Sequence, residues 1–346
     1  MINRFEHGDD GYQFEQEVIA DFSTNTWNLG PDPQLLSVLQ EQLNTIGHYP
    51  EVKAESLAGL IAESYGLHSN QVLVCNGTIE SIFLLAQLYA GKKSRIISPT
   101  FSEYEHACEI NNHSISFCGE NFINAGLNTE SDIFWLCNPN NPSGQLIKAE
   151  PLRKLIKNNP QTLFVIDEAY MDFCLEDESL ISSLQLMDNL VILKSMTKNS
   201  CLPGLRLGYL LCSTQLYKRL SAIKSPWSVN ALAVAAGKYT ISNPRITDTL
   251  RLQYHSEARA LANELKALGF EVTPSHTGYF LVKTPIESSV LKAHLLEKYH
   301  LLIRDAANFR TLSKNHIRVA SLGTKRNTLL IDALKMSVKK LQAVSC

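Results

Sequence analysis

Short apolar runs alternate with amphipathic segments along residues 71–193, and this alternation limits the possible folds more than any other feature. Strands are predicted at 71–75, 95–98, 114–118, 133–137, 162–166 and 190–193. Helices are predicted between several of them, at 79–88, 102–111 and 152–158. Runs that are apolar on both faces are typical of parallel strands. The pattern therefore predicts an α/β protein with a mostly parallel sheet sandwiched by helices, and ligands at the carboxyl ends of the strands.

The order of elements changes near residue 240, so we divide the chain into three parts. Residues 1–30 read as an irregular N-terminal arm with a short extended piece, which we expect to pack with the small domain. Residues 31–239 are expected to form the large domain, which opens with the helix start Asp32-Pro33. Residues 240–346 are expected to form a smaller α+β domain. Its predicted elements are helices at 250–268, 291–299 and 325–343 and strands at 278–283, 301–303 and 317–320.

Composition favours small-molecule chemistry in the cytoplasm. The formal net charge is −2, and the interleaved charges leave no basic stripe for nucleic acid or an anionic membrane. The N-terminus lacks the apolar core of a signal peptide, and apolar patches such as 82–90 are too short to span a bilayer. The eight cysteines include no CxxC and no zinc-like cluster. We therefore expect reduced thiols, no metal site, and neither nucleic acid nor membrane as a partner.

Several polar clusters follow predicted strands, and a parallel sheet would gather them at one edge. Gly77 and Thr78 open a helix after a strand, where free backbone N–H groups can hold a phosphate. Asn141 lies in a double-proline turn that either presents its amide to a ligand or is a plain surface turn. Asp167 ends an apolar strand, where a carboxylate needs a compensating cation such as a protonated ring nitrogen. Tyr170, three residues on, can point to the same ligand.

The segment 189–209 places Lys198 just after an apolar strand, with Arg206 close behind. A lysine in a partly desolvated pocket beside an anion-binding arginine can act as a nucleophile toward aldehydes. A lysine taken alone is more often a solvated surface residue. The clusters together describe one device, in which Lys198 binds an aldehyde cofactor covalently and Asp167 keeps its pyridinium charged. The remaining expected ligands are Asn141 and Tyr170 at the phenolic oxygen, and Thr78, Ser195 and Arg206 at the phosphate.

Three motifs, NPNNPSG, VIDEAY and SMTK followed by GLRLGY, together resemble the fold-type I pyridoxal-phosphate enzymes of the aspartate aminotransferase superfamily. The resemblance covers nearly the whole chain. It implies pyridoxal 5'-phosphate as the cofactor, Lys198 as the lysine that binds it, and Phe101 stacked on its ring. It also implies a homodimer with shared active sites, in which Tyr49 reaches the cofactor phosphate of the neighbouring subunit. Tyr49 could instead be a core tyrosine beside a helix.

The same resemblance implies a small phosphorylated amino-acid substrate. Arg318, in NHIRVAS, resembles the arginine that pairs with the substrate carboxylate in this superfamily. Arg304, in LLIRDAANF, matches the position at which the histidinol-phosphate aminotransferase branch holds the substrate phosphate. Asn25, in DFSTNTWNLGP, and Asn141 are further expected substrate ligands. Arg304 and Arg318 could each instead be a surface charge.

Within that branch, DFSTNTWNLGP, PTFSEYEHA and IRDAANF are similar to the L-threonine-O-3-phosphate decarboxylases of cobalamin synthesis, which form (R)-1-amino-2-propanol O-2-phosphate. The segment HGDD departs from the family's usual HGGN, because Asp9 and Asp10 replace the last two positions. Two carboxylates would repel a phosphate. This departure puts in doubt whether the N-terminal segment binds the substrate phosphate.

Two reaction types remain open. A decarboxylase would release carbon dioxide without an acceptor, whereas a histidinol-phosphate aminotransferase would need a 2-oxo acid, and the same residues serve both. A pyridoxal-phosphate sensor attached to a transcription regulator would need a DNA-binding module, but no basic helix-turn-helix precedes Asp21. A nicotinamide dehydrogenase is disfavoured because no GxGxxG follows a predicted strand. We therefore expect decarboxylation of threonine phosphate, with amino transfer as the alternative.

Overall fold

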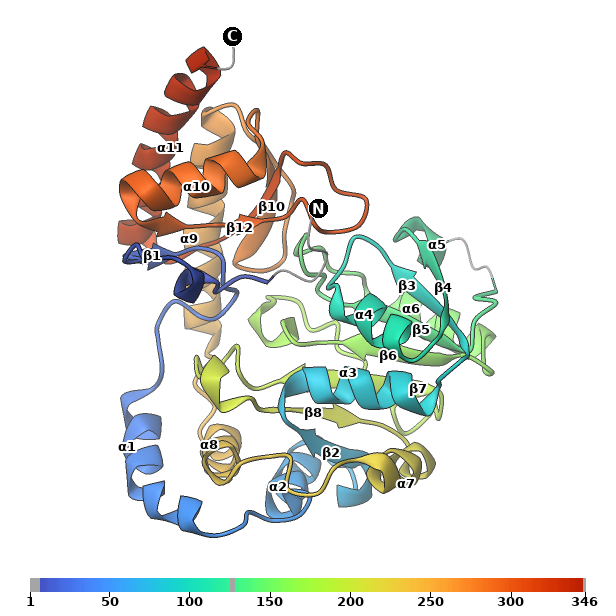
Figure 1. Ribbon diagram of the computed structural model, residues 1–346. Coiled ribbons are helices and arrows are strands. Elements are labelled where there is room, and N and C mark those ends of the chain that lie inside the picture. The colour runs from blue at the N-terminus through green and yellow to red at the C-terminus, as the bar shows by residue number, and fades with distance from the viewer. Residues whose placement is uncertain (1–6, 125–127, 345–346) are drawn as a thin grey trace.

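The computed structural model describes residues 7–124 and 128–344, which form a large lobe and a small lobe joined near residues 243–247 (Figure 1). The small lobe, with α9 (Asp248–Ala267), α10 (Ser288–Tyr299) and α11 (Thr324–Val344), lies above the large lobe in this view. No helix among the described residues has the length and apolar character needed to cross a membrane.

The large lobe is built on a seven-stranded sheet with the strand order β2-β8-β7-β6-β5-β3-β4. Its strands are β2 (Val72–Cys75), β3 (Lys93–Ile97), β4 (Ser114–Cys118), β5 (Ile133–Cys137), β6 (Leu163–Asp167), β7 (Leu190–Ser195) and β8 (Gly208–Leu211). Strand β8 runs opposite to the other six strands, which are parallel to one another. The prediction of a mostly parallel α/β sheet is confirmed, and the carboxyl ends of six strands meet at one edge.

Helices cover both faces of this sheet. They are α1 (Pro33–Glu41), α2 (Glu55–Tyr65), α3 (Gly77–Leu88), α4 (Glu103–Ile110), α5 (Asn121–Asn124), α6 (Ala149–Asn158), α7 (Thr214–Ile223) and α8 (Ala231–Ser242). Short 3-10 turns are η1 (Gly11–Gln13), η2 (Leu43–Gly47), η3 (Ser69–Gln71), η4 (Met171–Phe173), η5 (Ile181–Ser183) and η6 (Pro203–Leu205). Neighbouring strand residues alternate between two apolar cores, because successive side chains in a strand point to opposite faces. Phe134 packs with α2, α6 and α8, whereas Trp135 packs with α3, α4 and α7.

Helix α1 begins as predicted, but most of its apolar face is not covered by this chain. Asp32 caps the helix by accepting a hydrogen bond from the Gln34 backbone N–H, and Pro33 occupies the first turn. Leu35 is buried, whereas Leu36 and Leu43 are 40% and 49% exposed. Leu36 of α1 and Leu43 of the following 3-10 turn η2 therefore present apolar surface outward.

The small lobe contains an antiparallel sheet with the order β12-β13-β10-β9. Its strands are β9 (Glu271–Val272), β10 (Tyr279–Lys283), β12 (Arg304–Asp305) and β13 (His316–Ala320). The strand expected at 301–303 is divided, because β11 (Leu301–Leu302) pairs instead with β1 (Ala20–Asp21) of the N-terminal arm. Phe22 of the arm is fully buried in the small-lobe core. The arm thus lies on the small lobe and leads from it to the large lobe.

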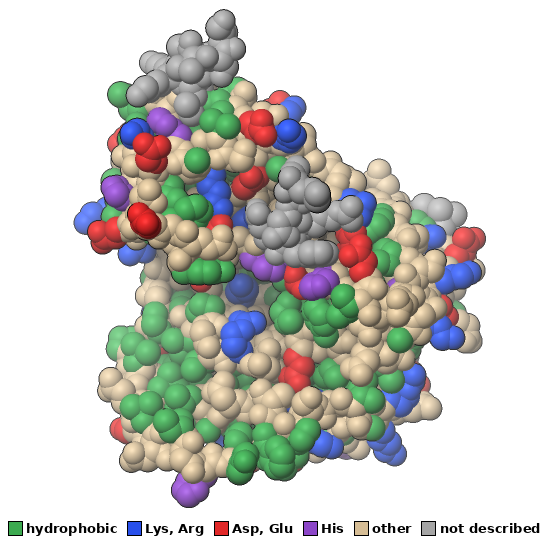
Figure 2. All heavy atoms as spheres, viewed as in Figure 1, with side chains coloured by type: hydrophobic (Ala, Val, Ile, Leu, Met, Phe, Trp, Pro, Cys, Tyr) green, Lys and Arg blue, Asp and Glu red, His purple; other side chains and the backbone are tan. Residues whose placement is uncertain are grey.

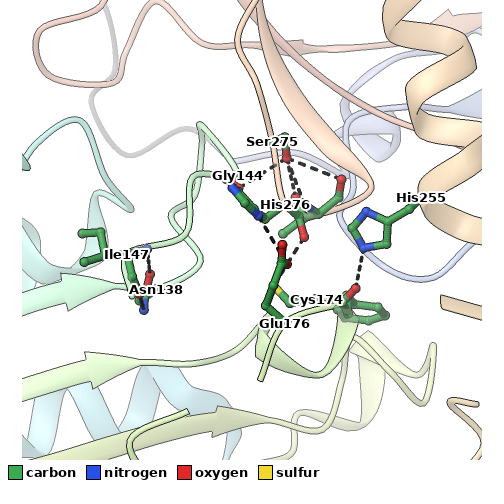
Figure 3. A network of polar contacts seen from close by, with 10 residues as sticks. Asn138, Gly144, Ile147, Cys174, Glu176, His255, Ser275 and His276 are labelled. Atoms are coloured by element: carbon green, nitrogen blue, oxygen red, sulfur yellow. Dashed lines mark hydrogen bonds and ion pairs between the residues drawn. The ribbon is translucent and has the colours of Figure 1, made fainter. Parts of the chain in front are cut away.

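A polar junction holds a loop of the small lobe against the large lobe (Figure 3). The backbone N–H of His276 donates to the Gly144 carbonyl at 2.8 Å, and the Cys174 thiol donates to the His276 carbonyl at 3.3 Å. His255 Nε2 lies 2.8 Å from the Phe173 carbonyl. These contacts fix the proline-rich turn that precedes Gly144 and the segment that follows β6 relative to the small lobe. Groups from both lobes can therefore meet across the sheet edge.

Candidate active site

A cavity of about 280 Å³ lies between the lobes at the carboxyl edge of the large sheet, and Figure 2 shows basic side chains inside this hollow. Its size is near the lower end of the range for small-molecule sites. Among the residues that line it are Asn25, Gly77, Thr78, Phe101, Asn141, Asp167, Tyr170, Ser195, Lys198, Arg206, Arg304 and Arg318. The fold thus brings together every predicted site residue except Tyr49.

Lys198 lies three residues beyond the end of β7, with its side chain partly buried in the cavity. Burial and the nearby guanidinium groups of Arg318 and Arg206 lower the pKa of its amine to about 8, although Asp167 acts in the opposite direction. Its Nζ lies 5.9 Å from the centre of the Tyr170 ring. A substantial share of this amine is neutral near pH 8, which is the form that attacks an aldehyde.

Asp167, the last residue of β6, is a carboxylate that is only 4% exposed. Its Oδ2 accepts a hydrogen bond from the Tyr104 hydroxyl at 2.7 Å, and its Oδ1 accepts one from the Ala169 N–H at 3.0 Å. Burial raises the pKa of Asp167, and these hydrogen bonds and Lys198 oppose the rise. A protonated ring nitrogen in the cavity would add the compensating charge that a buried carboxylate needs.

Tyr104 was not predicted as part of the site. Its spacing from Phe101 in PTFSEY could have indicated it, because residues three apart in a helical turn lie on the same side. Both residues line the cavity, and their ring centroids are 5.7 Å apart.

The start of α3 and the end of β7 form an anion-binding corner. Gly77 has φ +75°, and a Cβ atom there would lie 2.7 Å from Arg206 Nη2. A Cβ on Gly208 would lie 2.7 Å from the Thr78 backbone nitrogen. Both positions need glycine, so that backbone and guanidinium can approach closely. Free N–H groups at a helix start and an arginine are suited to bind phosphate.

The hydroxyl of Ser195 reaches the same cavity and lies 2.9 Å from the hydroxyl of Thr197. Sequence reasoning missed Thr197. It lies in the turn directly after β7, one residue before Lys198, and its hydroxyl position beside Ser195 was the available signal.

Arg318, in β13 of the small lobe, lines the cavity. Its Nη1 donates to Asn141 Oδ1 at 2.5 Å, and its Nη2 donates to the Ser23 carbonyl of the arm. The guanidinium is buried, which lowers its pKa, and its Nε has no hydrogen-bond partner among residues 7–124 and 128–344. Across the cavity, Asn25 Nδ2 donates to the Tyr170 hydroxyl at 3.3 Å. The arm therefore shapes the site from the small-lobe side.

Arg304 is also buried, and it lies at the opening of β12. Its Nη1 donates to the Asp305 carbonyl at 2.6 Å and its Nη2 to Asn308 Oδ1 at 2.9 Å. Its guanidinium carbon lies 5.3 Å from the centre of the Phe309 ring. Arg304 and Arg318 thus present two buried positive charges to one cavity.

The N-terminal segment contributes one carboxylate to the cavity rather than two. Asp9 lines the cavity, whereas Asp10 forms an ion pair with Lys292 of α10 and does not line it. Gly8 packs so closely on the arm that a Cβ would lie 2.3 Å from the Ser23 carbonyl oxygen. The expected repulsion of a phosphate is therefore reduced to the charge of Asp9.

Tyr49 lies outside the cavity of its own chain. It is 85% exposed, and its ring centroid is 5.2 Å from that of Trp227. The reading of Tyr49 as a core tyrosine is wrong, because the side chain is exposed to solvent. A role at an active site would require a second copy of the chain.

Residues 18–334 match the family model of aminotransferase class I and II. The chain belongs to this family. It is similar to the threonine-phosphate decarboxylase of Salmonella typhimurium, with 30% identity over 92% of this chain and 91% of that protein. It is also similar to the histidinol-phosphate aminotransferase of Nitratidesulfovibrio vulgaris (strain Hildenborough), with 30% identity over 92% of this chain and 88% of that protein. The crystal structure of L-threonine-O-3-phosphate decarboxylase from Porphyromonas gingivalis has a TM-score of 0.89 and 34% identity, covering 93% of this chain and 100% of that chain.

As a class I and II aminotransferase-family protein, the chain uses pyridoxal phosphate as its cofactor. The structure fits this group in three respects. The corner at Gly77 and Gly208 leaves room that a Cβ would fill, Asp167 is a buried carboxylate facing the cavity, and Lys198 supplies an amine of lowered pKa. Among the described residues, no group of three or more His, Cys, Asp or Glu side chains is placed to hold a metal ion.

Proposed function

We propose that this chain decarboxylates L-threonine O-3-phosphate to (R)-1-amino-2-propanol O-2-phosphate, as a pyridoxal-phosphate-dependent lyase of cobalamin synthesis. The observation that carries the proposal is the pair of buried arginines, Arg304 and Arg318, facing one cavity with Lys198. Two separate cations suit a substrate with two anionic groups, a carboxylate and a phosphate. The relatives of the same length that are named for this reaction support the choice.

Each residue has a defined task in this proposal. Pyridoxal phosphate, when bound, supplies an electron sink for the bond that breaks at the substrate Cα. Lys198 provides the amine that holds the cofactor and can carry a proton to and from Cα, while Asp167 keeps the ring nitrogen protonated. Arg318 binds the substrate carboxylate, and Arg304 binds the substrate phosphate. The cavity-lining residues that would contact the cofactor are Asn141 and Tyr170 at the phenolic oxygen, Phe101 on the ring face, and Gly77, Thr78, Ser195 and Arg206 at the phosphate.

Amino transfer from histidinol phosphate is the alternative, because the chain is equally identical to an aminotransferase of that specificity. Both reactions would use the same lysine. They differ in the bond that breaks at Cα, which is the bond to the carboxylate in decarboxylation and the bond to hydrogen in amino transfer. The decisive assay incubates the purified holoenzyme with L-threonine O-3-phosphate in the absence of any oxo acid and measures carbon dioxide. Release over many turnovers that is lost in Lys198→Ala supports the proposal. No release, together with oxo-acid-dependent transfer from histidinol phosphate, would contradict it.

We further infer that two copies of the chain form a dimer with shared active sites. The support is an exposed apolar surface formed by Leu36, Leu43, Ile46, Tyr49 and Trp227, in which Ile46 is 68% exposed. Apolar patches of this kind mark interaction sites. Tyr49 would reach the cofactor phosphate of the partner subunit.

Mixing two inactive variants tests this sharing. Lys198→Ala and Tyr49→Ala alter different residues of one composite site, so a mixed dimer contains one intact site if the site is shared. We expect mixing to restore activity, with a dimer mass by analytical ultracentrifugation. A monomer, or a mixture as inactive as its components, would contradict the inference.

A further inference from the structure

Asp172 connects the two ends of the short segment that carries Lys198. Its Oδ1 accepts a hydrogen bond from Lys194 Nζ at 2.5 Å, and its Oδ2 accepts one from Asn199 Nδ2 at 3.2 Å. Lys194 lies in β7, before the active-site lysine, and Asn199 follows that lysine directly. One carboxylate therefore ties the segment at both ends.

Lys194 and Asp172 form an ion pair at one end of the segment. The ammonium group of Lys194 is buried, and burial alone would lower its pKa. The charges of Asp172 and Glu168 and the Tyr65 hydroxyl reverse this effect, so the pKa of Lys194 is raised and the group stays charged. The Lys194 side chain is 5% exposed and the Asp172 side chain is 37% exposed, and separating this pair would leave the buried lysine charge uncompensated.

The segment 194–199 lies between two cavities, so space is open on both sides of it. A second cavity of about 310 Å³ is lined by Asp172, Lys194 and Asn199, and Ser195 lines both this cavity and the active-site cavity. No hydrogen bond to Lys198 Nζ occurs within the described part of the chain. The lysine is held through its backbone, whose carbonyl accepts a hydrogen bond from the Trp27 N–H at 3.2 Å.

We propose that Asp172 is a positioning residue, which keeps Lys198 in the active-site cavity by fixing both ends of the segment 194–199. This inference rests on the proposed role of Lys198 in holding the cofactor. Without the connection, the segment can shift toward the second cavity and carry the amine away from Arg206 and Arg318. The amine would then titrate closer to its ordinary value.

The test uses two variants that avoid leaving a buried charge unpaired. Asn199→Ala removes one end and keeps the ion pair, and the double variant Asp172→Asn with Lys194→Met removes both charges of the other end. The readout is the rate at which the apoprotein captures pyridoxal 5'-phosphate, measured by absorbance across pH. We expect the midpoint to rise from about 8 toward 10.5 in both variants. A rise of about one unit makes capture at pH 8 about fivefold slower, because less of the amine is neutral.

Asp177→Asn is the matched control. This aspartate lies in the same loop between β6 and β7 as Asp172, but it accepts a hydrogen bond from the Ser179 N–H at 3.3 Å and, among the described residues, makes no hydrogen bond or ion pair with the segment 194–199. It should leave the midpoint unchanged. Unchanged midpoints in both test variants, with only a lower unfolding temperature, would show a merely structural role and overturn the proposal. Failure of the proposed function is distinguishable. In that case the wild type would release no carbon dioxide, or Lys198→Ala apoprotein would capture the cofactor as the wild type does.

Discussion

Replacing Gly77 by alanine tests the anion-binding corner without touching any side chain that contacts a ligand. The backbone at Gly77 has φ +75°, in the left-handed region, where an L-residue with a Cβ is strained by about 1–2 kcal/mol. The new Cβ would also lie 2.7 Å from Arg206 Nη2, so the guanidinium must move. The first effect lowers the free energy of unfolding of the protein with or without cofactor. The second removes a charge-assisted hydrogen bond to phosphate.

Such a hydrogen bond contributes about 1.5–3 kcal/mol. Since each 1.4 kcal/mol corresponds to about tenfold in affinity, we expect Gly77→Ala to bind a phosphorylated cofactor about 10- to 150-fold more weakly. Gly91→Ala provides the control, because Gly91 has φ +74° but a Cβ there would meet nothing within 4 Å. It should lose similar stability and no affinity.

The assay titrates each apoprotein with pyridoxine 5'-phosphate by calorimetry. This analogue has the phosphate but no aldehyde, so the affinity reports on the phosphate corner and not on covalent capture by Lys198. Urea unfolding of the same proteins measures the strain. Wild-type affinity in Gly77→Ala would refute the placement of Arg206 at the phosphate, and a Gly91→Ala variant that binds as weakly would show that strain alone is responsible.

Three further predictions use the same structure. Tyr104→Phe removes the 2.7 Å hydrogen bond to Asp167, so we expect kcat to fall by about tenfold or more with the fold unchanged in circular dichroism; unaltered kcat would exclude this support for the carboxylate. Arg318→Ala should weaken substrate binding by about 2–5 kcal/mol, and Arg318→Lys should recover little because lysine lacks the planar fork; an unchanged KM would place the carboxylate elsewhere. Burial lowers the pKa of His255 below 6.5, so the unfolded chain takes up its proton first and stability is lost as pH falls below 6.5. His255→Gln should flatten this loss in urea unfolding between about pH 7.5 and about pH 5.5; a slope equal to that of the wild type would assign it to other groups.

The sequence predicted the parallel strands and the cavity residues for the same physical reason. Runs such as 133–137 and 163–166 are apolar at every position because both faces of the sheet are covered, and polar residues after them must then meet at one edge. Strand β8 was not predicted, since its four residues form no run that local patterning can separate from the preceding loop. Its antiparallel place between β2 and β7 is a long-range pairing.

Partners within the site were harder to predict than the site itself. The hydrogen bond from Tyr104 to Asp167 joins residues 63 positions apart. The hydrogen bond from Lys194 to Asp172 depends on the position of η4 relative to β7. Composition and spacing identify which groups need a partner, but the fold decides which group is near enough. The same limit applies to Tyr49, which is exposed in the single chain, so its proposed role depends on a second chain.

Which substrate anion Arg318 holds can be decided by comparing the binding of substrate and product. Arg318 donates a hydrogen bond to Asn141, which is also the expected ligand of the cofactor's phenolic oxygen. An anion bound by Arg318 would therefore lie close to the bound cofactor. The amino-propanol phosphate product has no carboxylate. If Arg318→Ala weakens the binding of substrate but not of product, Arg318 holds the carboxylate as proposed; if it weakens both, Arg318 holds the phosphate and the proposed division of roles with Arg304 is wrong.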